Sequence, residues 1–247
     1  MGRQKRSYIA VSAVAALLAV AGCAGQGRGT APGDAKGRPT APAPRTPSGN
    51  GKGPADGKGP AEGTLPGVPS AAQARTQLAR LKVAPQRSMT GYSRDRFPHW
   101  AEQGDSCNTR ETVLERDGRD VRRDAECRAV SGTWTSVYDG RTFTKASGLD
   151  IDHTVPLANA WRSGADTWTQ EKRKAFANDL TRPQLLAVSA VSNRSKGDQG
   201  PDEWQPPARS YWCAYARSWT AVKSSYALTV TKAEKATLVS MLDTCRG

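Results

Sequence analysis

Histidine is nearly absent from this chain of 247 residues, which carries only two, His99 and His153. A zinc site with two histidine ligands would therefore use both, and any acid–base step by an imidazole must use one of them. The sequence also lacks a Gly-x-Ser-x-Gly elbow, a P-loop and a dinucleotide-binding glycine fingerprint. These absences argue against an α/β-hydrolase serine triad, a P-loop nucleotidase and a dinucleotide-dependent enzyme.

Long apolar runs are also scarce, and the clearest one lies at the N-terminus. Residues 1–6 are basic, and residues 8–20 are mostly apolar. This order predicts a secretory signal peptide over 1–22, because the run is short for a membrane span and lacks a basic stop-transfer flank. Residues 20–23, Val-Ala-Gly-Cys, resemble a bacterial lipobox. We therefore expect Cys23 to be lipidated and to hold the protein on the extracellular face of the cell membrane. The alternative is a plain signal peptide and a secreted protein.

Aromatic residues are missing from residues 24–70, where 12 Gly and 9 Pro occupy the 47 positions. Such a segment cannot bury enough apolar surface to offset the entropy lost on ordering it. We therefore predict a lipidated Cys23 followed by a disordered tether over 23–70, with a reach of about 40 Å. The folded domain is expected over 71–247.

Residues 71–247 contain every Trp and Phe of the chain and have the usual length of a single domain. With 27 Lys and Arg against 20 Asp and Glu, this part has a net charge of +7. A basic domain favours polyanionic partners, which include nucleic acid, anionic lipid and cell-wall polymers. Charge alone does not choose among them. We expect a monomer.

Cys-x-x-Cys pairs are absent as well, which argues against a zinc site made of thiolates. An exported domain with four cysteines instead predicts two disulfides. Three pairings are possible. We predict Cys107 with Cys127 and Cys213 with Cys245, because each pair keeps its partners local in sequence.

Hydrophobic spacing and capping residues predict the local structure of the domain. Thr231 and Glu234 have the spacing of a capping box, and the last two helices form an antiparallel pair that Cys213 and Cys245 would join. Helices are predicted over 72–82, 110–117, 156–161, 169–178, 210–224 and 231–244, and strands over 133–138, 149–155 and 185–189.

One predicted strand carries most of the candidate chemistry. Residues 149–157 read Leu-Asp-Ile-Asp-His-Thr-Val-Pro-Leu. Strand alternation places Asp150 and Asp152 on one face and His153 on the other. Asn178 follows in Asn-Asp-Leu, and residues 193–198 read Asn-Arg-Ser-Lys-Gly-Asp.

These motifs, in this order, resemble the HNH (ββα-metal) nucleases. The closest resemblance is to the branch of secreted bacterial HNH-family proteins related to the C-terminal domain of GmrSD-type restriction enzymes. It covers about residues 90–245 and extends to segments outside the core motifs. Those segments are 92–94, 97–100, 107–111, 132–134 and 202–206.

The resemblance implies an α+β fold in which a ββα-metal core is decorated with helices. It implies that Asp152 and Asn193 ligate one divalent metal and that His153 is the general base. Asn178 would tie the connecting loop together and support the histidine. Oxygen-only ligation favours Mg²⁺ or Mn²⁺ over Zn²⁺. Three cations are expected to hold substrate phosphates, namely Arg194, Lys196 and Arg110.

Each assignment has a structural alternative. We expect His99 to be a packing residue and Asp150 to be structural or solvated, and whether they or Arg110 belong to the site stays open. The remaining alternatives are an ordinary strand histidine at His153, a cap of the helix after Pro156 for Asp152, a C-cap for Asn178, an N-cap for Asn193, and a solvated face for Arg194 and Lys196.

The expected function is that of an exported, membrane-anchored, metal-dependent endonuclease that hydrolyses phosphodiester bonds of DNA, with RNA as a second possible substrate. One alternative is a non-catalytic basic lipoprotein that binds cell-wall or other polyanions. Another is a hydrolase of smaller phosphodiesters that uses the same site. The intact Asp152–His153 pair with Asn193 favours the nuclease, because a binding protein does not need these residues.

Overall fold

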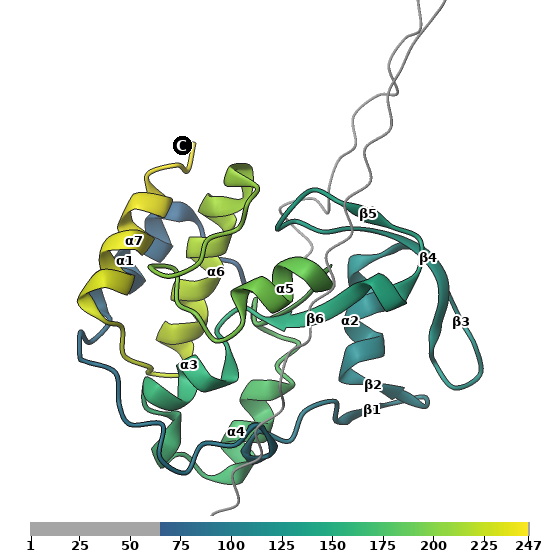
Figure 1. Ribbon diagram of the computed structural model, residues 1–247, viewed down its shortest axis with the longest axis horizontal. Coiled ribbons are helices and arrows are strands. Elements are labelled where there is room, and N and C mark those ends of the chain that lie inside the picture. Colours follow the sequence, from purple (N-terminus) through teal and green to yellow (C-terminus); the bar gives the residue numbers. More distant parts are fainter. Residues whose placement is uncertain (1–64, 247) are drawn as a thin grey trace, which may run out of the picture. The chain divides into compact units, whose positions relative to one another are not determined.

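Figure 1 shows the computed structural model, which describes residues 65–246. The predicted signal peptide, Cys23 and the tether up to residue 64 lie outside the described residues. Helices and short strands follow one another along the described chain, which confirms the predicted α+β class. In this part of the chain, every helix is too short or too polar to cross a membrane. The last predicted tether residues contact the domain, since Leu65 packs on the main core.

Two antiparallel strands and one helix lie at the centre of Figure 1. β6 (Leu149–His153) pairs with β7 (Leu185–Ser189) residue for residue along its whole length. α5 (Ala190–Lys196) follows β7 directly and contacts both strands. Ser189 caps this helix, and Gly197, with a φ of 51°, ends it. The predicted strand over 149–155 therefore stops two residues early, and the predicted strand over 185–189 is confirmed.

The connection between the two strands is helical. It consists of α3 (Leu157–Arg162), the 3-10 turn η3 (Ala165–Thr167) and α4 (Gln170–Ala177). Thr169 is the N-cap of α4, and its side chain accepts the backbone N–H of Lys172. This connection brings the end of α4 beside the end of β6.

Three longer helices lie together on one side of the unit formed by β6, β7 and α5 (Figure 1). They are α1 (Ala71–Arg80), α6 (Trp212–Ser225), which follows the turn η4 (Arg209–Tyr211), and α7 (Lys232–Leu242). The predicted capping box of Thr231 and Glu234 begins α7, and a second box, of Ser70 and Gln73, begins α1. Their apolar faces bury one core, which includes Leu78, Tyr215, Trp219, Val222, Leu238 and Met241, with Leu186 and Val188 from β7.

A smaller part, rich in strands, covers the other face of the β6–β7 pair. Its buried residues Val113, Leu114 and Trp134 pack against Leu149, Ile151, Leu185 and Ala187. The strand pair is therefore buried on both faces, which explains why β7 is apolar up to its last residue, Ser189. The elements of this part are the turn η2 (Ala146–Gly148), β1 (Glu102–Gly104), β2 (Cys107–Asn108), α2 (Thr109–Asp117), β3 (Arg119–Arg123), β4 (Ala129–Thr135) and β5 (Thr142–Phe143). The turn η1 (Arg94–Arg96) lies between Tyr92 and Phe97, which both pack on the main core.

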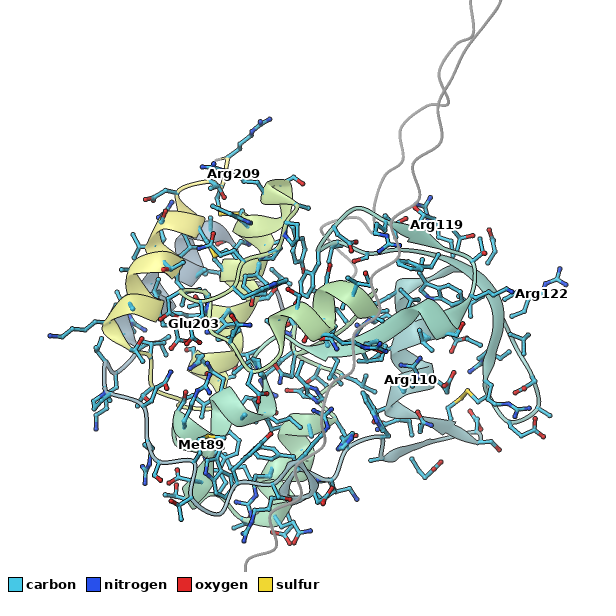
Figure 2. The ribbon with its side chains drawn as sticks, viewed as in Figure 1. Met89, Arg110, Arg119, Arg122, Glu203 and Arg209 are labelled. Atoms are coloured by element: carbon cyan, nitrogen blue, oxygen red, sulfur yellow. A yellow bond between two sulfur atoms is a disulfide. The ribbon has the colours of Figure 1, made fainter. Side chains whose placement is uncertain are left out.

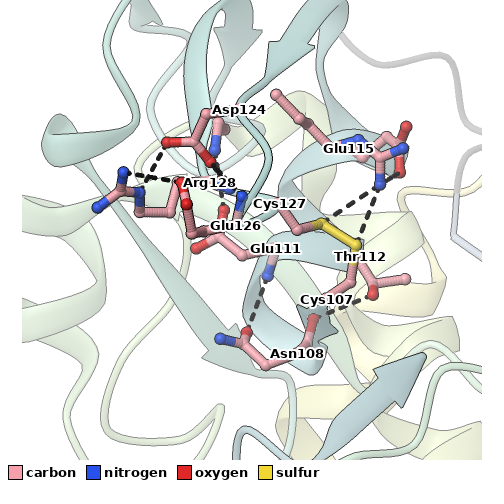
Figure 3. Close-up of a disulfide and its surroundings, with 11 residues drawn as sticks. Cys107, Asn108, Glu111, Thr112, Glu115, Asp124, Glu126, Cys127 and Arg128 are labelled. Atoms are coloured by element: carbon pink, nitrogen blue, oxygen red, sulfur yellow. Dashed lines mark hydrogen bonds and ion pairs between the residues drawn. A yellow bond between two sulfur atoms is a disulfide. The ribbon is translucent and has the colours of Figure 1, made fainter. Parts of the chain in front are cut away.

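Both predicted disulfides are present. Cys107–Cys127 joins β2 to the turn between β3 and β4, and Figure 3 shows it beside α2. Arg123 lies against this disulfide, with its Nη1 at 3.1 Å and 3.3 Å from the two sulfurs. Cys213–Cys245 joins the start of α6 to the segment after α7. It therefore closes the open end of the helical pair.

Sequence patterning missed β1, β2, β3 and β5 of the smaller part and found only the end of β4. β3 is Arg-Asp-Val-Arg-Arg, largely exposed, and pairs with β4 through two register shifts. Figure 2 shows Arg119 and Arg122 at the outer edge of this part. Without a buried face, such a strand has no apolar alternation to reveal it. The predicted strand over 133–138 is the second half of β4, which begins at Ala129 and ends at Thr135.

Candidate active site

His153 is the last residue of β6, and its ring is held by α4. The side chain is 5% exposed, and its Nε2 lies 3.0 Å from the carbonyl oxygen of Ala177. Because a carbonyl can only accept a hydrogen bond, Nε2 must carry the proton. Nδ1 is then the unprotonated nitrogen of the neutral imidazole.

The surroundings of His153 keep it neutral. Burial lowers its pKa to about 3, and the nearby cations Arg94 and Lys196 act in the same direction. The ring of Trp100 lies beside the imidazole, with the ring centres 6.1 Å apart. The imidazole is therefore a proton acceptor throughout the neutral pH range.

Asn178 fixes the loop that leads to Trp100. Its Oδ1 accepts the backbone N–H of Ala101 and the hydroxyl of Thr109, each at 2.8 Å. Its Nδ2 donates to the carbonyls of Pro98 and Lys174, also at 2.8 Å each. Asn178 is thus the C-cap residue of α4 and also ties the loop to that helix.

Asp152 points to the opposite face of β6, where it meets α5. Lys196 donates to its Oδ1 at 2.8 Å and to its Oδ2 at 2.6 Å. Tyr138 donates to Oδ2 at 2.5 Å. The carboxylate therefore does not cap the helix after Pro156, which has no side-chain cap. Burial raises the pKa of Asp152 and lowers that of Lys196, and their mutual attraction opposes both shifts.

Lys196 does not lie where the sequence analysis expected it. Its side chain is 0% exposed, and the third bond of its ammonium group goes to the carbonyl of His153 at 2.8 Å. A phosphate outside the domain cannot reach this group, and the solvated-face alternative does not agree with the burial either. Lys196 instead joins α5 to the end of β6.

Asn193 and Arg194 contact the other acidic residue of β6. Asn193 Nδ2 donates to Asp150 Oδ2 at 3.3 Å, and Arg194 Nε lies 3.4 Å from the same oxygen. Asn193 is inside α5 and not its N-cap, which is Ser189. Its Nδ2 is used by Asp150, so its amide oxygen is the atom left for a ligand. The side chain of Arg194 is 76% exposed.

A small cleft brings most of these groups together. Its volume is about 180 Å³, and its wall includes Asp152, His153, Asn193 and Arg194. Arg94, from η1, lines the same cleft, although the sequence analysis gave it no role. The resemblance in residues 92–94 was the only signal that pointed to it.

Two other candidates lie outside this cleft. Arg110 Nη2 donates to the carbonyls of Ala146 and Leu149, at 3.4 Å and 3.2 Å, near the end of β6 opposite His153. Figure 2 shows Arg110 on α2. Its expected role in phosphate binding does not agree with this position. His99 Nδ1 donates to the carbonyl of Phe97 at 2.9 Å, and the ring packs on Trp100, as expected of a packing residue.

The donor set of the cleft fits a hard divalent cation with few protein ligands. Asp152 and Asn193 both line it and both offer oxygen. Within residues 65–246, no three His, Cys, Asp or Glu side chains gather as a metal site. Water and substrate phosphate would have to complete the coordination, which is the usual arrangement for Mg²⁺.

A neutral histidine, a carboxylate and an asparagine thus surround one cleft of an α+β domain. The model of the family described as GmrSD restriction endonucleases, C-terminal domain, matches residues 108–241, which is more than half of the chain. The chain belongs to this family, within the HNH superfamily.

The chain is also similar to a protein of Arthroderma benhamiae described as an uncharacterized secreted protein. The two are 58% identical over 182 residues, which covers 74% of this chain and 89% of that protein. No solved structure matches the chain.

Asn178→Ala should loosen the loop at residues 98–101. The substitution leaves the Ala101 N–H and the Pro98 carbonyl without their partner, so unfolding free energy should fall by about 2–3 kcal/mol. Amide hydrogen exchange at residues 99–101 should rise at the same time. Asn178→Asp keeps the acceptor and loses the two amide bonds, so its effect should be smaller. Equal exchange in all three proteins would contradict the tying role.

Proposed function

We propose that the domain is a metal-dependent endonuclease that hydrolyses phosphodiester bonds of DNA, with RNA as a second possible substrate. The observation that carries this proposal is the tautomer of His153. Its Nε2 is engaged by the Ala177 carbonyl, which leaves Nδ1 unprotonated, and His153 lines the same cleft as Asp152 and Asn193. A neutral, fixed imidazole in a polar cleft is suited to general-base catalysis.

In this proposal β6, β7 and α5 are the ββα-metal core of an HNH nuclease. The order of strand, strand and helix along the chain supports it. Membership of the GmrSD C-terminal-domain family supports it as well. His153 stands at the end of the first strand and Asn193 in the helix, as the resemblance implies.

The chain's own residues would then share the chemistry. His153 Nδ1 takes a proton from a water molecule, and the resulting hydroxide attacks phosphorus while the bond to the 3′ oxygen breaks. Asn178 acts only through position, by holding the loop and the end of α4 beside the imidazole. Arg194 and Arg94 hold the phosphate from the two sides of the cleft. A divalent cation held by Asp152 and Asn193, Mg²⁺ or Mn²⁺ rather than Zn²⁺, would stabilise the charge that develops on the phosphate and on the leaving oxygen.

We further propose that the protein is exported, lipidated at Cys23 and monomeric. The order of basic, apolar and small residues before Cys23 supports export. The Arthroderma benhamiae relative is described as secreted, which supports export too. A secreted protein without the lipid remains the alternative for localisation.

His153→Ala should remove most cleavage of plasmid DNA in Mg²⁺ or Mn²⁺. Loss of a positioned general base costs on the order of 10²–10⁴-fold in rate, so the initial rate should fall by that factor. His99→Gln is the matched control, because it changes the other histidine, and it should keep most of the wild-type rate. A His153→Ala protein as active as the wild type would sink the mechanism. A wild type with no metal-dependent cleavage of DNA or RNA would favour the polyanion-binding alternative.

Arg194→Gln should weaken DNA binding and make it less sensitive to salt. One lost phosphate contact lowers the slope of log K against log salt by about 0.9, as measured by fluorescence anisotropy across salt concentrations. Arg110→Gln removes the same charge from a position outside the cleft, so its slope should stay that of the wild type. Equal slopes in all three proteins would exclude Arg194 from the interface.

Cys23→Ala should release the protein from membranes. The lipobox resemblance makes Cys23 the acylated residue, and two or more acyl chains give stable anchoring. Phase partitioning in detergent followed by immunoblotting measures the change. A substituted protein that partitions fully with the membrane fraction would contradict lipidation at this residue.

A further inference from the structure

Lys196 satisfies the buried carboxylate of Asp152 without any metal. The lysine is 0% exposed and Asp152 is 4% exposed. The ammonium group donates to both oxygens of Asp152 and to the His153 carbonyl, which matches its three protons. No proton of this group is left for a substrate phosphate.

A buried carboxylate needs such a partner. Transfer of an unpaired charge into the domain interior is costly, and removing one partner of a buried pair is strongly destabilising. If a bound cation were the sole countercharge of Asp152, the domain would lose that stability whenever the cation left. With Lys196 in place, β6 and α5 stay joined in either state.

The same geometry makes Lys196 repel a cation that binds to Asp152. Because Nζ contacts both oxygens of Asp152, a cation ligated by either oxygen would lie close to a full positive charge in a region of low dielectric. The neighbouring donor to Asp152, Tyr138, carries no charge and does not repel a cation. Arg94 and Arg194 also line the cleft, but Lys196 is the cation that contacts both oxygens of Asp152.

We propose that Lys196 is a built-in countercharge of Asp152 that competes with the divalent cation, so that it keeps the empty site folded and lowers the affinity for the metal. This inference rests on the metal site of the proposed nuclease. It assigns Lys196 a positioning role in place of the phosphate contact expected from the sequence.

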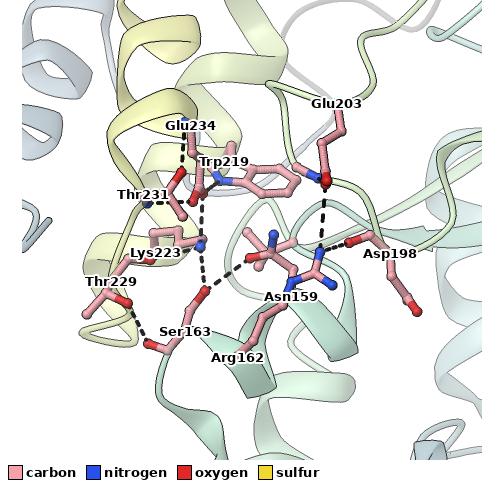
Figure 4. Close-up of polar contacts among 12 residues, drawn as sticks. Asn159, Arg162, Ser163, Asp198, Glu203, Trp219, Lys223, Thr229, Thr231 and Glu234 are labelled. Atoms are coloured by element: carbon pink, nitrogen blue, oxygen red, sulfur yellow. Dashed lines mark hydrogen bonds and ion pairs between the residues drawn. The ribbon is translucent and has the colours of Figure 1, made fainter. Parts of the chain in front are cut away.

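Lys223 offers a matched control, shown in Figure 4. It is also 0% exposed, and its Nζ contacts Glu234 at 2.9 Å and Ser163 at 2.8 Å. Its third partner is the carbonyl of Thr229 at 2.9 Å. Lys223→Gln therefore removes a buried, ion-paired lysine just as Lys196→Gln does, but the carboxylate left behind is not Asp152.

The test compares the full chain, with both disulfides formed, in three versions: wild type, Lys196→Gln and Lys223→Gln. Affinity for Mn²⁺ alone is measured by calorimetry, and melting temperature is measured in EDTA and in Mn²⁺. Both variants should melt below the wild type in EDTA. Lys196→Gln should bind Mn²⁺ at least about 10-fold more tightly than the wild type, because a unit charge close to a cation outweighs one decade of affinity. Mn²⁺ should also raise its melting temperature more than that of either other protein.

Several results would overturn the proposal. Mn²⁺ affinity of Lys196→Gln equal to or weaker than that of the wild type would do so, as would equal tightening in Lys223→Gln. If Lys196→Gln is unfolded in EDTA, the proposal requires Mn²⁺ to refold it, and a protein still unfolded in Mn²⁺ contradicts it.

Tyr138→Phe should leave the affinity for Mn²⁺ within about threefold of the wild type. An effect as large as that of Lys196→Gln would exclude charge as the cause. None of these readouts needs cleavage, so failure of the nuclease proposal is seen separately.

Discussion

The ion pair between Lys196 and Asp152 connects the helix α5 to the strand β6, and the geometry of the cleft depends on that connection. One turn earlier in the helix, Asn193 meets Asp150 in the same way. Two acidic residues spaced by two on a strand thus face two residues spaced by three on a helix. This match fixes the rotation of α5 on the strand pair. It also fixes which side chains of the helix reach the cleft.

The pair is linked to the rest of the domain through Trp219 of α6. The Nζ of Lys196 lies 5.9 Å from the centre of this ring, and the Nζ of Lys223 lies 5.7 Å from it. Trp219 also donates to Glu234 of α7 at 2.6 Å. The helical pair closed by Cys213–Cys245 therefore supports the candidate site through one aromatic ring that lies near two buried ammonium groups. A substitution in α6 or α7 that moves Trp219 would change the surroundings of Lys196, and Lys196 is the partner of Asp152.

Local patterning was sufficient for the elements that are buried or capped. It predicted β7 and the capping box of α7, and strand alternation correctly separated Asp152 from His153. It failed where tertiary context overrides the usual meaning of a residue. A lysine in an Asn-Arg-Ser-Lys run is typical of the protein surface. Its burial is stable only because another element, β6, supplies a carboxylate as its partner. Arg110 was misjudged for the same reason, because backbone carbonyls of η2 and β6 take its guanidinium group.

The partner of His153 has a consequence for its strength as a base. A carboxylate on Nε2 would stabilise the imidazolium and raise the pKa, whereas here burial outweighs the smaller rise that the Ala177 carbonyl causes and leaves the pKa at about 3. An imidazole with so low a pKa is unprotonated at neutral pH, but it is a weak proton acceptor. Phosphates that enter the cleft bring negative charge close to the ring, and negative charge favours the imidazolium. In the proposed mechanism, the substrate itself therefore raises the pKa of His153 toward the range in which a general base works well.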